Sequence, residues 1–292
     1  MKKSKNLRTL VEERKLILAP GAFDALTAKI IEAQGFDAVY MTGYGTSASI
    51  FGLPDLGLLT MTEMLQNASR MADAIDIPLI ADADTGYGNP INVIRTVREY
   101  EKAGVSAIQI EDQVWPKRCG HMKGKRVIDL EEMVGKIKAA VDTRTSSDLL
   151  IVVRTDAIAT HGFDHAIERG NIYAEAGADI LFIEAPENRE QIEKIPKILS
   201  AKPHLINMGP LTPNMSVEEL GRMGYTIVIY PGVCLAASIS GCTTELKRIL
   251  ETGRQRDFGD WMQSFVDLNN FLGVPYYSEM EQKYKTGNTL SK

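Results

Sequence analysis

The chain of 292 residues is 44% hydrophobic and 24% charged, an ordinary composition for a globular protein with a large core. Its formal net charge of -5 at pH 7 argues against nucleic acid or an anionic membrane as a partner, because both bind basic faces. No apolar run approaches the ~20 residues that span a bilayer, and the basic N-terminus lacks the apolar segment of a signal peptide. The three cysteines form no disulfide framework, so we expect a reducing compartment, the cytoplasm.

Short apolar runs alternate with amphipathic stretches along most of the chain. The amphipathic stretches have the spacing of helices, and three of them end in Ala-Gly or Gln-Gly, a common helix stop. Eight apolar strands, each followed by a helix, favour a closed parallel (β/α)8 barrel of the TIM type over a doubly wound sheet. The predicted strands are residues 16–20, 38–43, 78–84, 106–112, 149–156, 180–185, 204–209 and 226–232.

No linker or change of composition divides these units. We therefore predict a single domain over residues 1–292, with a C-terminal helical extension over about 254–292. Two helical segments, at about 234–252 and 254–271, follow the eighth strand. Their apolar positions exceed what the barrel can bury, so we expect them to pack against another subunit.

Charged side chains collect where the predicted strands end. Because the active site of such a barrel lies at the C-terminal ends of its strands, these side chains should converge. Asp82 and Asp84 are two residues apart and point the same way. For that pair alone, loop solubility or helix capping is an alternative explanation. Several acids beside one arginine repel one another unless a hard cation such as Mg²⁺ lies among them. The strand ends carry Asp82, Asp84, Glu111, Asp112, Arg154, Asp156, Glu184 and Asn207.

Two glycine-containing segments lie near these strand ends. We predict that YMTGYGTSAS (40–49) is a loop whose backbone amides approach an anion. The pattern GYG recurs at 86–88, where it either brings backbone close to the metal or forms a structural turn.

The segment WPKRCGHMKGK (115–125) follows the fourth strand and overhangs the same mouth. Its basic residues Lys117, Arg118 and His121 would favour the thiolate and lower the pKa of Cys119. Gly120 and Gly124 give the segment the freedom of a catalytic lid. The alternatives are a solvated basic loop and a covalent nucleophile paired with His121.

The chain resembles the isocitrate lyase/phosphoenolpyruvate mutase superfamily from about residue 7 to 275. The resemblance rests on PGAFDALTAKIIEAQGFDAVYMTGYG, LPDLGLLTMTEM, IADADTGYG, IQIEDQVWPKRCGH, RTDA and FIEAP. The motif KRCGH is similar to the signature of the carbon–carbon lyase branch, which includes methylisocitrate and dimethylmalate lyases and oxaloacetate acetylhydrolases. The phosphonate mutase branch lacks it. The resemblance implies an (α/β)8 barrel, bound Mg²⁺ (or Mn²⁺), and a homotetramer that exchanges its C-terminal helix.

Carried over by motif, the resemblance assigns a role to each site residue. Asp82 and Asp84 would hold the metal, with Asp55 and Glu111 in the water-filled shell around it. Cys119, on a mobile lid, would protonate the departing carbanion. Tyr40, Glu111 and His121 complete the expected catalytic group. Tyr40, Tyr44 or a metal-linked carboxylate would take the hydroxyl proton. The expected substrate contacts are Thr42, Gly43, Tyr44, Gly120, Arg154, Glu184 and Asn207.

Two departures from methylisocitrate lyases indicate the substrate. Those enzymes have a longer loop with an acid after the seventh strand, where this chain has NMGPLTP (207–213), and an arginine where this chain has Ala236. Both changes remove polar groups from the place of a third carboxylate, and an unpartnered buried carboxylate costs several kcal/mol. We therefore expect a smaller 2-hydroxy dicarboxylate, such as 2,3-dimethylmalate or another 2-alkylmalate.

The expected reaction is the cleavage of that diacid into a 2-oxo acid such as pyruvate and a carboxylate such as propionate or succinate. The alternatives are hydrolysis or decarboxylation of oxaloacetate on the same site, and a phosphonate mutase-type reaction. A non-catalytic barrel that only binds or assembles is a further alternative. It is disfavoured because the Asp82/Asp84 pair and Cys119 are all present.

Overall fold

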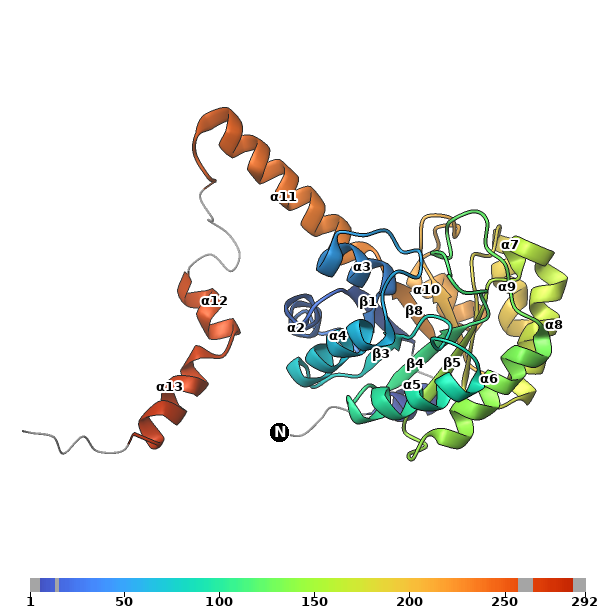
Figure 1. The fold of residues 1–292 in the computed structure, drawn as a ribbon. Helices are drawn as coiled ribbons and strands as arrows, with labels where there is room; N and C mark the ends of the chain where they lie inside the picture. Colours follow the sequence, from blue (N-terminus) through green and yellow to red (C-terminus); the bar gives the residue numbers. More distant parts are fainter. Residues whose placement is uncertain (1–5, 14–15, 257–264, 286–292) are drawn as a thin grey trace, which may run out of the picture. The chain divides into compact units, whose positions relative to one another are not determined.

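The computed structural model describes residues 6–13, 16–256 and 265–285 (Figure 1). Eight parallel strands close into a barrel in chain order, and β8 pairs with β1, so the predicted (β/α)8 fold is confirmed. All eight predicted runs contain a strand, although several strands end earlier than expected. The strands are β1 (Ile17–Ala22), β2 (Val39–Met41), β3 (Leu79–Asp82), β4 (Ala107–Glu111), β5 (Leu150–Thr155), β6 (Ile180–Ile183), β7 (His204–Asn207) and β8 (Ile227–Tyr230).

Helices follow the strands, and local capping signals set where several of them begin. Asn89 caps α5 ahead of Pro90, and Thr60 and Glu63 form a reciprocal capping box on α4. The described barrel helices are α1 (Leu7–Glu12), α2 (Ala25–Ala33), α3 (Gly43–Phe51), α4 (Met61–Ala74), α5 (Pro90–Lys102), α6 (Leu130–Thr143), α7 (Ile158–His161), α8 (Phe163–Glu175), α9 (Arg189–Ile198) and α10 (Val217–Met223).

Alternation along the strands separates two apolar layers. On β5, Leu150 and Val152 belong to the cluster inside the barrel, whereas Ile151 and Val153 pack against the outer helices. The next inward position on this strand is Arg154. The same two-residue step puts Asp82, Glu111, Glu184 and Asn207 above the interior cluster at the C-terminal ends of their strands. The strand period therefore delivers the charged residues to the mouth of the barrel.

The chain divides into two compact units, residues 1–237 and 238–292. Helix α11 (Val233–Thr252) runs into the second unit, which also contains α12 (Phe265–Phe271) and α13 (Val274–Lys283). The prediction of a helix from residue 254 was wrong for 254–256, because Gly253 adopts a left-handed φ of 68° that ends α11. The following residues, 257–264, lie outside the described part.

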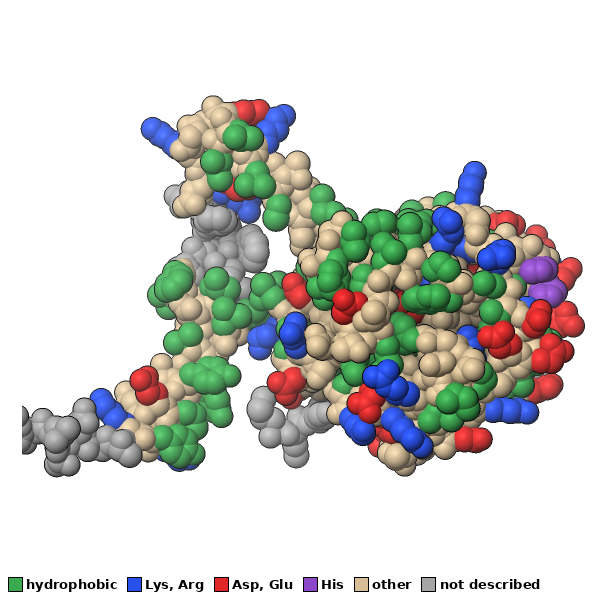
Figure 2. All heavy atoms as spheres, in the orientation of Figure 1, with side chains coloured by type: hydrophobic (Ala, Val, Ile, Leu, Met, Phe, Trp, Pro, Cys, Tyr) green, Lys and Arg blue, Asp and Glu red, His purple; other side chains and the backbone are tan. Residues whose placement is uncertain are grey.

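The helices of the second unit have no buried side chain in the described part of the chain. Apolar side chains are exposed along these helices (Figure 2). Leu250, Phe265 and Tyr277 are among the exposed large hydrophobic residues. Packing of this extension on another subunit stays a prediction. Over the described residues, no helix is both long and apolar enough to cross a membrane.

At the N-terminal end of the barrel, Asp179 joins three segments. It accepts a hydrogen bond from Ile151 N (2.9 Å) and pairs with Arg144 and with Arg8 Nη2 (3.1 Å). Replacing Asp179 with alanine should lower the free energy of unfolding by about 1–3 kcal/mol, because a buried N–H loses its acceptor. Urea denaturation measures this. The exposed Asp148, replaced by alanine, is the control, and an equal loss in both variants would contradict the assignment.

Candidate active site

Asp82, at the end of β3, is held by the backbone around it. Its Oδ2 accepts from Gly43 N (3.2 Å), and its Oδ1 accepts from Asp84 N (3.0 Å). A Cβ on Gly43 would lie 2.5 Å from Asp82 Oδ2, so only glycine leaves this approach open. Asp84 itself has a φ of 49°, and the φ of Gly86, Tyr87 and Gly88 is also positive, at 80°, 60° and 146°. Residues 84–88 therefore form a tight turn. The two carboxylates are thus fixed side by side.

Lys117 of the KRCGH motif lies between two of the predicted acids. Its Nζ is 2.5 Å from Asp55 Oδ1 and 2.8 Å from Asp84 Oδ1, and all three side chains are buried. Burial opposes the charge on Lys117, but Asp84 and Asp55 raise its pKa well above the usual value, so it stays an ammonium ion. This cation links the lid segment (residues 115–125) to the carboxylate pair.

Tyr40 reaches the same carboxylates through a residue that sequence reasoning missed. Its hydroxyl donates to Gln109 Oε1 (3.0 Å), and Gln109 Nε2 lies 3.4 Å from Asp82 Oδ1. Burial, and then the charge of Asp82, raise the pKa of Tyr40 well above its usual value, so the phenol keeps its proton at neutral pH. Gln109 precedes Glu111 by two residues on β4, and strand alternation was the signal that marks it as inward-facing.

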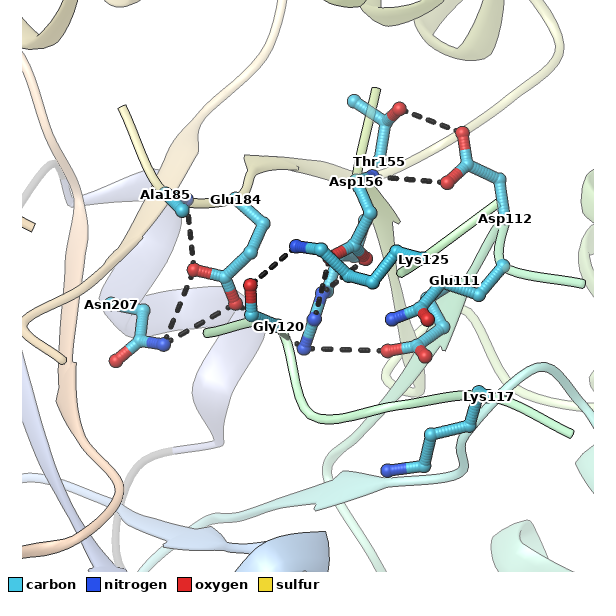
Figure 3. A network of polar contacts seen from close by, with 12 residues as sticks. Glu111, Asp112, Lys117, Gly120, Lys125, Thr155, Asp156, Glu184, Ala185 and Asn207 are labelled. Atoms are coloured by element: carbon cyan, nitrogen blue, oxygen red, sulfur yellow. Dashed lines mark hydrogen bonds and ion pairs between the residues drawn. The ribbon is translucent and has the colours of Figure 1, made fainter. Parts of the chain in front are cut away.

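Arg154 is buried among three carboxylates. Asp156 binds it in a bidentate pair (2.9 and 3.0 Å), and its Nη1 lies 3.3 Å from both Glu111 Oε2 and Glu184 Oε2. Burial opposes this charge, but Asp156 and Glu111 raise the pKa of Arg154 further. Glu184 in turn lies 3.3 Å from Asn207 Nδ2 and accepts from Ala185 N (Figure 3). The predicted Arg154, Glu184 and Asn207 therefore form one network.

A second polar layer supports this network from behind (Figure 3). Asp112 accepts from the Thr155 hydroxyl (2.7 Å) and from Asp156 N (3.0 Å), and it pairs with Arg169 of α8 (3.1 Å). These bonds fix the backbone that carries Asp156, and through it Arg154. The sequence placed Asp112 and Asp156 at strand ends but gave no role to Arg169, which lies in a helix and shows no motif.

The lid segment is docked at several points. Gln113 accepts from Arg118 N (3.0 Å) and donates to its carbonyl, and Cys119 N donates to Asp55 O (3.1 Å). Lys125 Nζ binds both Asp156 Oδ1 (2.7 Å) and the carbonyl of Gly120. Sequence reasoning missed Lys125 because its pairing depends on the conformation of the segment. The thiol of Cys119 is thereby held over the barrel mouth.

The expected effect of the basic residues on Cys119 was wrong. Burial raises the pKa of this thiol, and Asp55 and Glu184 also raise it. The hydrogen bond from the His121 backbone N–H and the charge of Arg154 only partly offset this rise. Lys117 has little effect on the pKa of Cys119, because its charge is neutralised by Asp55 and Asp84. Cys119 is therefore a protonated thiol at neutral pH, a state suited to giving a proton.

The predicted loop at 40–49 was also wrong in form. Residues 43–51 make helix α3, and Thr42 caps it by accepting from Gly45 N (3.1 Å). A Cβ on Gly45 would meet the Thr42 side chain at 2.5 Å, so the glycine permits this cap. The predicted anion-facing amides thus belong to a helix N-terminus, beside the Asp82/Asp84 pair.

A cavity of about 270 Å³ lies at the barrel mouth and gathers most of the predicted site residues. Gly43, Asp84 and Glu111 lie outside its lining and contact residues that form it. The apolar part of its wall, around Phe182 and Ile229, was not predicted. The predicted residues in the lining are Tyr40, Thr42, Tyr44, Asp55, Asp82, Cys119, Gly120, His121, Arg154, Glu184 and Asn207.

Known proteins share this sequence and architecture. The family model described as phosphoenolpyruvate phosphomutase matches residues 7–250. The chain belongs to this family, the phosphoenolpyruvate mutase/isocitrate lyase superfamily. It is 49% identical to a 2,3-dimethylmalate lyase of Eubacterium barkeri, over 98% of this chain and 100% of the relative. It is 43% identical to a 2-methylisocitrate lyase of Aeropyrum pernix, over 94% of this chain and 89% of the relative. The expected superfamily and carbon–carbon lyase class are confirmed.

Solved structures of superfamily members have the same fold. Oxaloacetate acetylhydrolase in complex with 3,3-difluorooxalacetate matches with a TM-score of 0.92 and 36% identity, over 98% of each chain. Phosphonopyruvate hydrolase in complex with oxalate and Mg²⁺ matches with a TM-score of 0.88 and 31% identity, over 97% of this chain and 99% of the other. The superfamily thus includes lyase and hydrolase chemistry on one barrel.

The donor set of this superfamily member fits a hard divalent cation. Asp84 Oδ1 and Glu111 Oε1 are buried without a hydrogen-bond donor, although Lys117 lies 2.8 Å from the former outside hydrogen-bonding geometry. Burial raises the pKa of Asp84 to about 6 and that of Glu111 well above its usual range. In residues 6–13, 16–256 and 265–285, no three His, Cys, Asp or Glu converge as a metal cage. Mg²⁺ needs only one or two carboxylates, because it retains water.

The raised pKa of Cys119 gives a test. Only the thiolate reacts with iodoacetamide, so the rate of alkylation should reach half its maximum at a higher pH in the protein than in a peptide of residues 115–125. The peptide is the control, because it has the same basic neighbours without the burial. In the protein, the rate is measured by mass spectrometry of the proteolytic fragment that contains Cys119. A midpoint below that of the free peptide would show that the basic residues dominate.

Proposed function

We propose that this chain is a Mg²⁺-dependent carbon–carbon lyase that cleaves a 2-hydroxy dicarboxylate of the 2,3-dimethylmalate or 2-alkylmalate type. The products are a 2-oxo acid such as pyruvate and a carboxylate such as propionate. The relative with 49% identity is a 2,3-dimethylmalate lyase, which supports this substrate class.

The distribution of charge around the cavity carries the proposal. Lys117 and Arg154 are the cations in its described lining, and both lie against the buried acids. The wall from β7 and β8 is lined by Gly209, Pro210, Ile229, Pro231 and Gly232 and offers no cation. A third carboxylate there would be buried without a partner, at a cost of several kcal/mol. Alkyl substituents fit this wall. Ala236 lies on α11, outside the lining.

The residues that would hold the metal are Asp82 and Asp84, with Asp55 and Glu111 close to them. When bound, Mg²⁺ supplies a Lewis acid that stabilises negative charge on the oxygen atoms of the substrate. Arg154 would bind the carboxylate of the 2-oxo acid, with Glu184 and Asn207 fixing its orientation. The capped N-terminus of α3, at Thr42, Gly43 and Tyr44, would receive the other carboxylate.

Cleavage breaks the bond between the hydroxyl-bearing carbon, C2, and its neighbour C3, which lies next to the second carboxyl group. Loss of the hydroxyl proton makes the first carbon a carbonyl, and the electron pair of the bond moves into the second carboxyl group as an enediolate. The Cys119 thiol then gives its proton to C3 of this enediolate. The raised pKa of Cys119 keeps the proton on the thiol until that step. Because Tyr40 also holds its proton, a metal-linked carboxylate is the proposed acceptor of the hydroxyl proton.

The assembly belongs to the same proposal. The exposed apolar side chains of α11, α12 and α13 support packing on another copy, in a homotetramer that exchanges these helices. We further propose a cytoplasmic location and one domain over 1–292, with the second unit as its extension.

Replacing Cys119 with serine should lower kcat by about 10²–10⁴-fold, because a serine hydroxyl is a much poorer proton donor at this site. Mg²⁺ binding, measured by isothermal titration calorimetry, should be retained. The exposed Cys242, replaced by serine, is the matched control and should keep full activity. Near-normal turnover by the Cys119 variant would remove the proposed role.

A substrate panel tests the function itself. We expect Mg²⁺-dependent release of 2-oxo acid from 2,3-dimethylmalate and 2-alkylmalates, with methylisocitrate at least about tenfold poorer in kcat/KM because its third carboxylate meets no cation. The similarity to oxaloacetate acetylhydrolase makes oxaloacetate the second candidate substrate. Oxalate or pyruvate formed from oxaloacetate, with no cleavage of the alkylmalates, would replace the lyase by that alternative.

A further inference from the structure

The imidazole of His121 joins the lid segment to the loop that follows β7. Its Nδ1 accepts a hydrogen bond from the backbone N of Leu211 (3.2 Å), and its Nε2 lies 3.0 Å from Asn207 Nδ2. Glu184 Oε1 is 3.6 Å from the same Nε2. The side chain of His121 is only 10% exposed, so the contact is an enclosed one.

Glycines on both sides of this contact allow the two segments to meet. A Cβ on Gly209 would lie 2.2 Å from His121 Nε2 and 2.7 Å from its Cε1. On the lid side, a Cβ on Gly120 would lie 2.3 Å from Arg154 Nη2. Neither glycine has a positive φ, so close approach, not backbone conformation, requires them. Any side chain at 209 would therefore displace the His121 ring.

The Leu211 amide also fixes the state of the ring. A backbone N–H can only donate, so the hydrogen bond from Leu211 N makes Nδ1 an unprotonated acceptor. Burial lowers the pKa of His121, and Arg154 and Lys125 lower it further against the opposing charges of Glu184 and Asp156. The ring is neutral at neutral pH, and a neutral ring in a fixed orientation cannot promote the thiolate at Cys119.

We propose that Gly209 and the Leu211 amide are positioning elements that hold the lid, through His121, so that Cys119 stands over the substrate cavity. Cys119 is two residues from His121, and its own amide is bonded to Asp55 O on the other side of the mouth. The segment is thus tied on both flanks of the thiol. The inference rests on the proposed role of Cys119 as proton donor.

A double-mutant cycle tests the steric part. Gly209→Ala should raise the rate of Cys119 alkylation in the ligand-free protein by about tenfold, because the added Cβ displaces His121 and the lid segment loses its contact with the loop after β7. In the His121→Ala background the same Gly209→Ala change should have no further effect, because the ring it displaces is gone. An equal increase in both backgrounds, or none in either, would overturn the proposal.

The hydrogen bond is tested by two conservative variants that keep the glycine. The side-chain oxygen of asparagine replaces Nδ1 of histidine, whereas that of glutamine replaces Nε2. His121→Asn should therefore keep Cys119 protected from alkylation, and His121→Gln should not. Equal rates in these two variants would overturn the role of the Leu211 amide. Because they leave Gly209 unchanged, this arm stands even if Gly209→Ala does not fold.

Turnover separates positioning from general structural damage. With the substrate that the panel identifies, Gly209→Ala should lower kcat by about 10²-fold and change KM by less than about threefold, because only the proton donor is displaced. A rise in KM with kcat unchanged would overturn the positioning role. The alkylation experiments need no substrate. If the wild-type protein cleaves no diacid, the proposed function fails, but the alkylation rates still test the contact of His121 with Gly209 and the Leu211 amide.

Discussion

Buried carboxylates in excess of buried cations are the condition on which the site depends. Six of them, Asp55, Asp82, Asp84, Glu111, Asp156 and Glu184, share the barrel mouth with Lys117, Lys125 and Arg154. Uncompensated charge in a low-dielectric interior is costly, and the raised pKa of Asp84 and of Glu111 expresses that cost. Lys117 and Lys125 of the lid segment reduce it, and the proposed divalent cation would reduce it further. In the proposed enzyme, the metal and the lid segment are therefore electrostatically coupled.

The lid completes this balance because two of the three cations belong to it. Lys117 and Lys125 come from residues 115–125 and pair with acids on other strands. Because the acids neutralise both lysines, the thiol of Cys119 between them lies in a buried environment that favours its protonated form. The cationic stretch thus pairs with the carboxylates, and Cys119 is left protonated, as its proposed role of proton donor requires.

The sequence brought most of the candidate site residues to one end of the barrel, where the structure also gathers them, because strand period and strand order are local properties. Asp82, Glu111 and Arg154 could be placed at the mouth from their positions in apolar runs alone. The sequence failed where distant segments meet. It did not assign Gln109 or Lys125. It took residues 40–49 for a loop, whereas residues 43–51 form α3, because the glycines there support a turn as well as a capped helix. The sign of the pKa shift at Cys119 was wrong because nearest neighbours in sequence are not its nearest charges.

The sequence by itself determined the barrel, the inward face of each strand, and the presence of a thiol after β4, since each follows from spacing along the chain. Only the tertiary structure decided which acid each lysine pairs with, that Cys119 keeps its proton, and that His121 rests on Gly209 and the Leu211 amide. Burial and contact between segments 31 to 90 residues apart control those properties, and no local pattern records them.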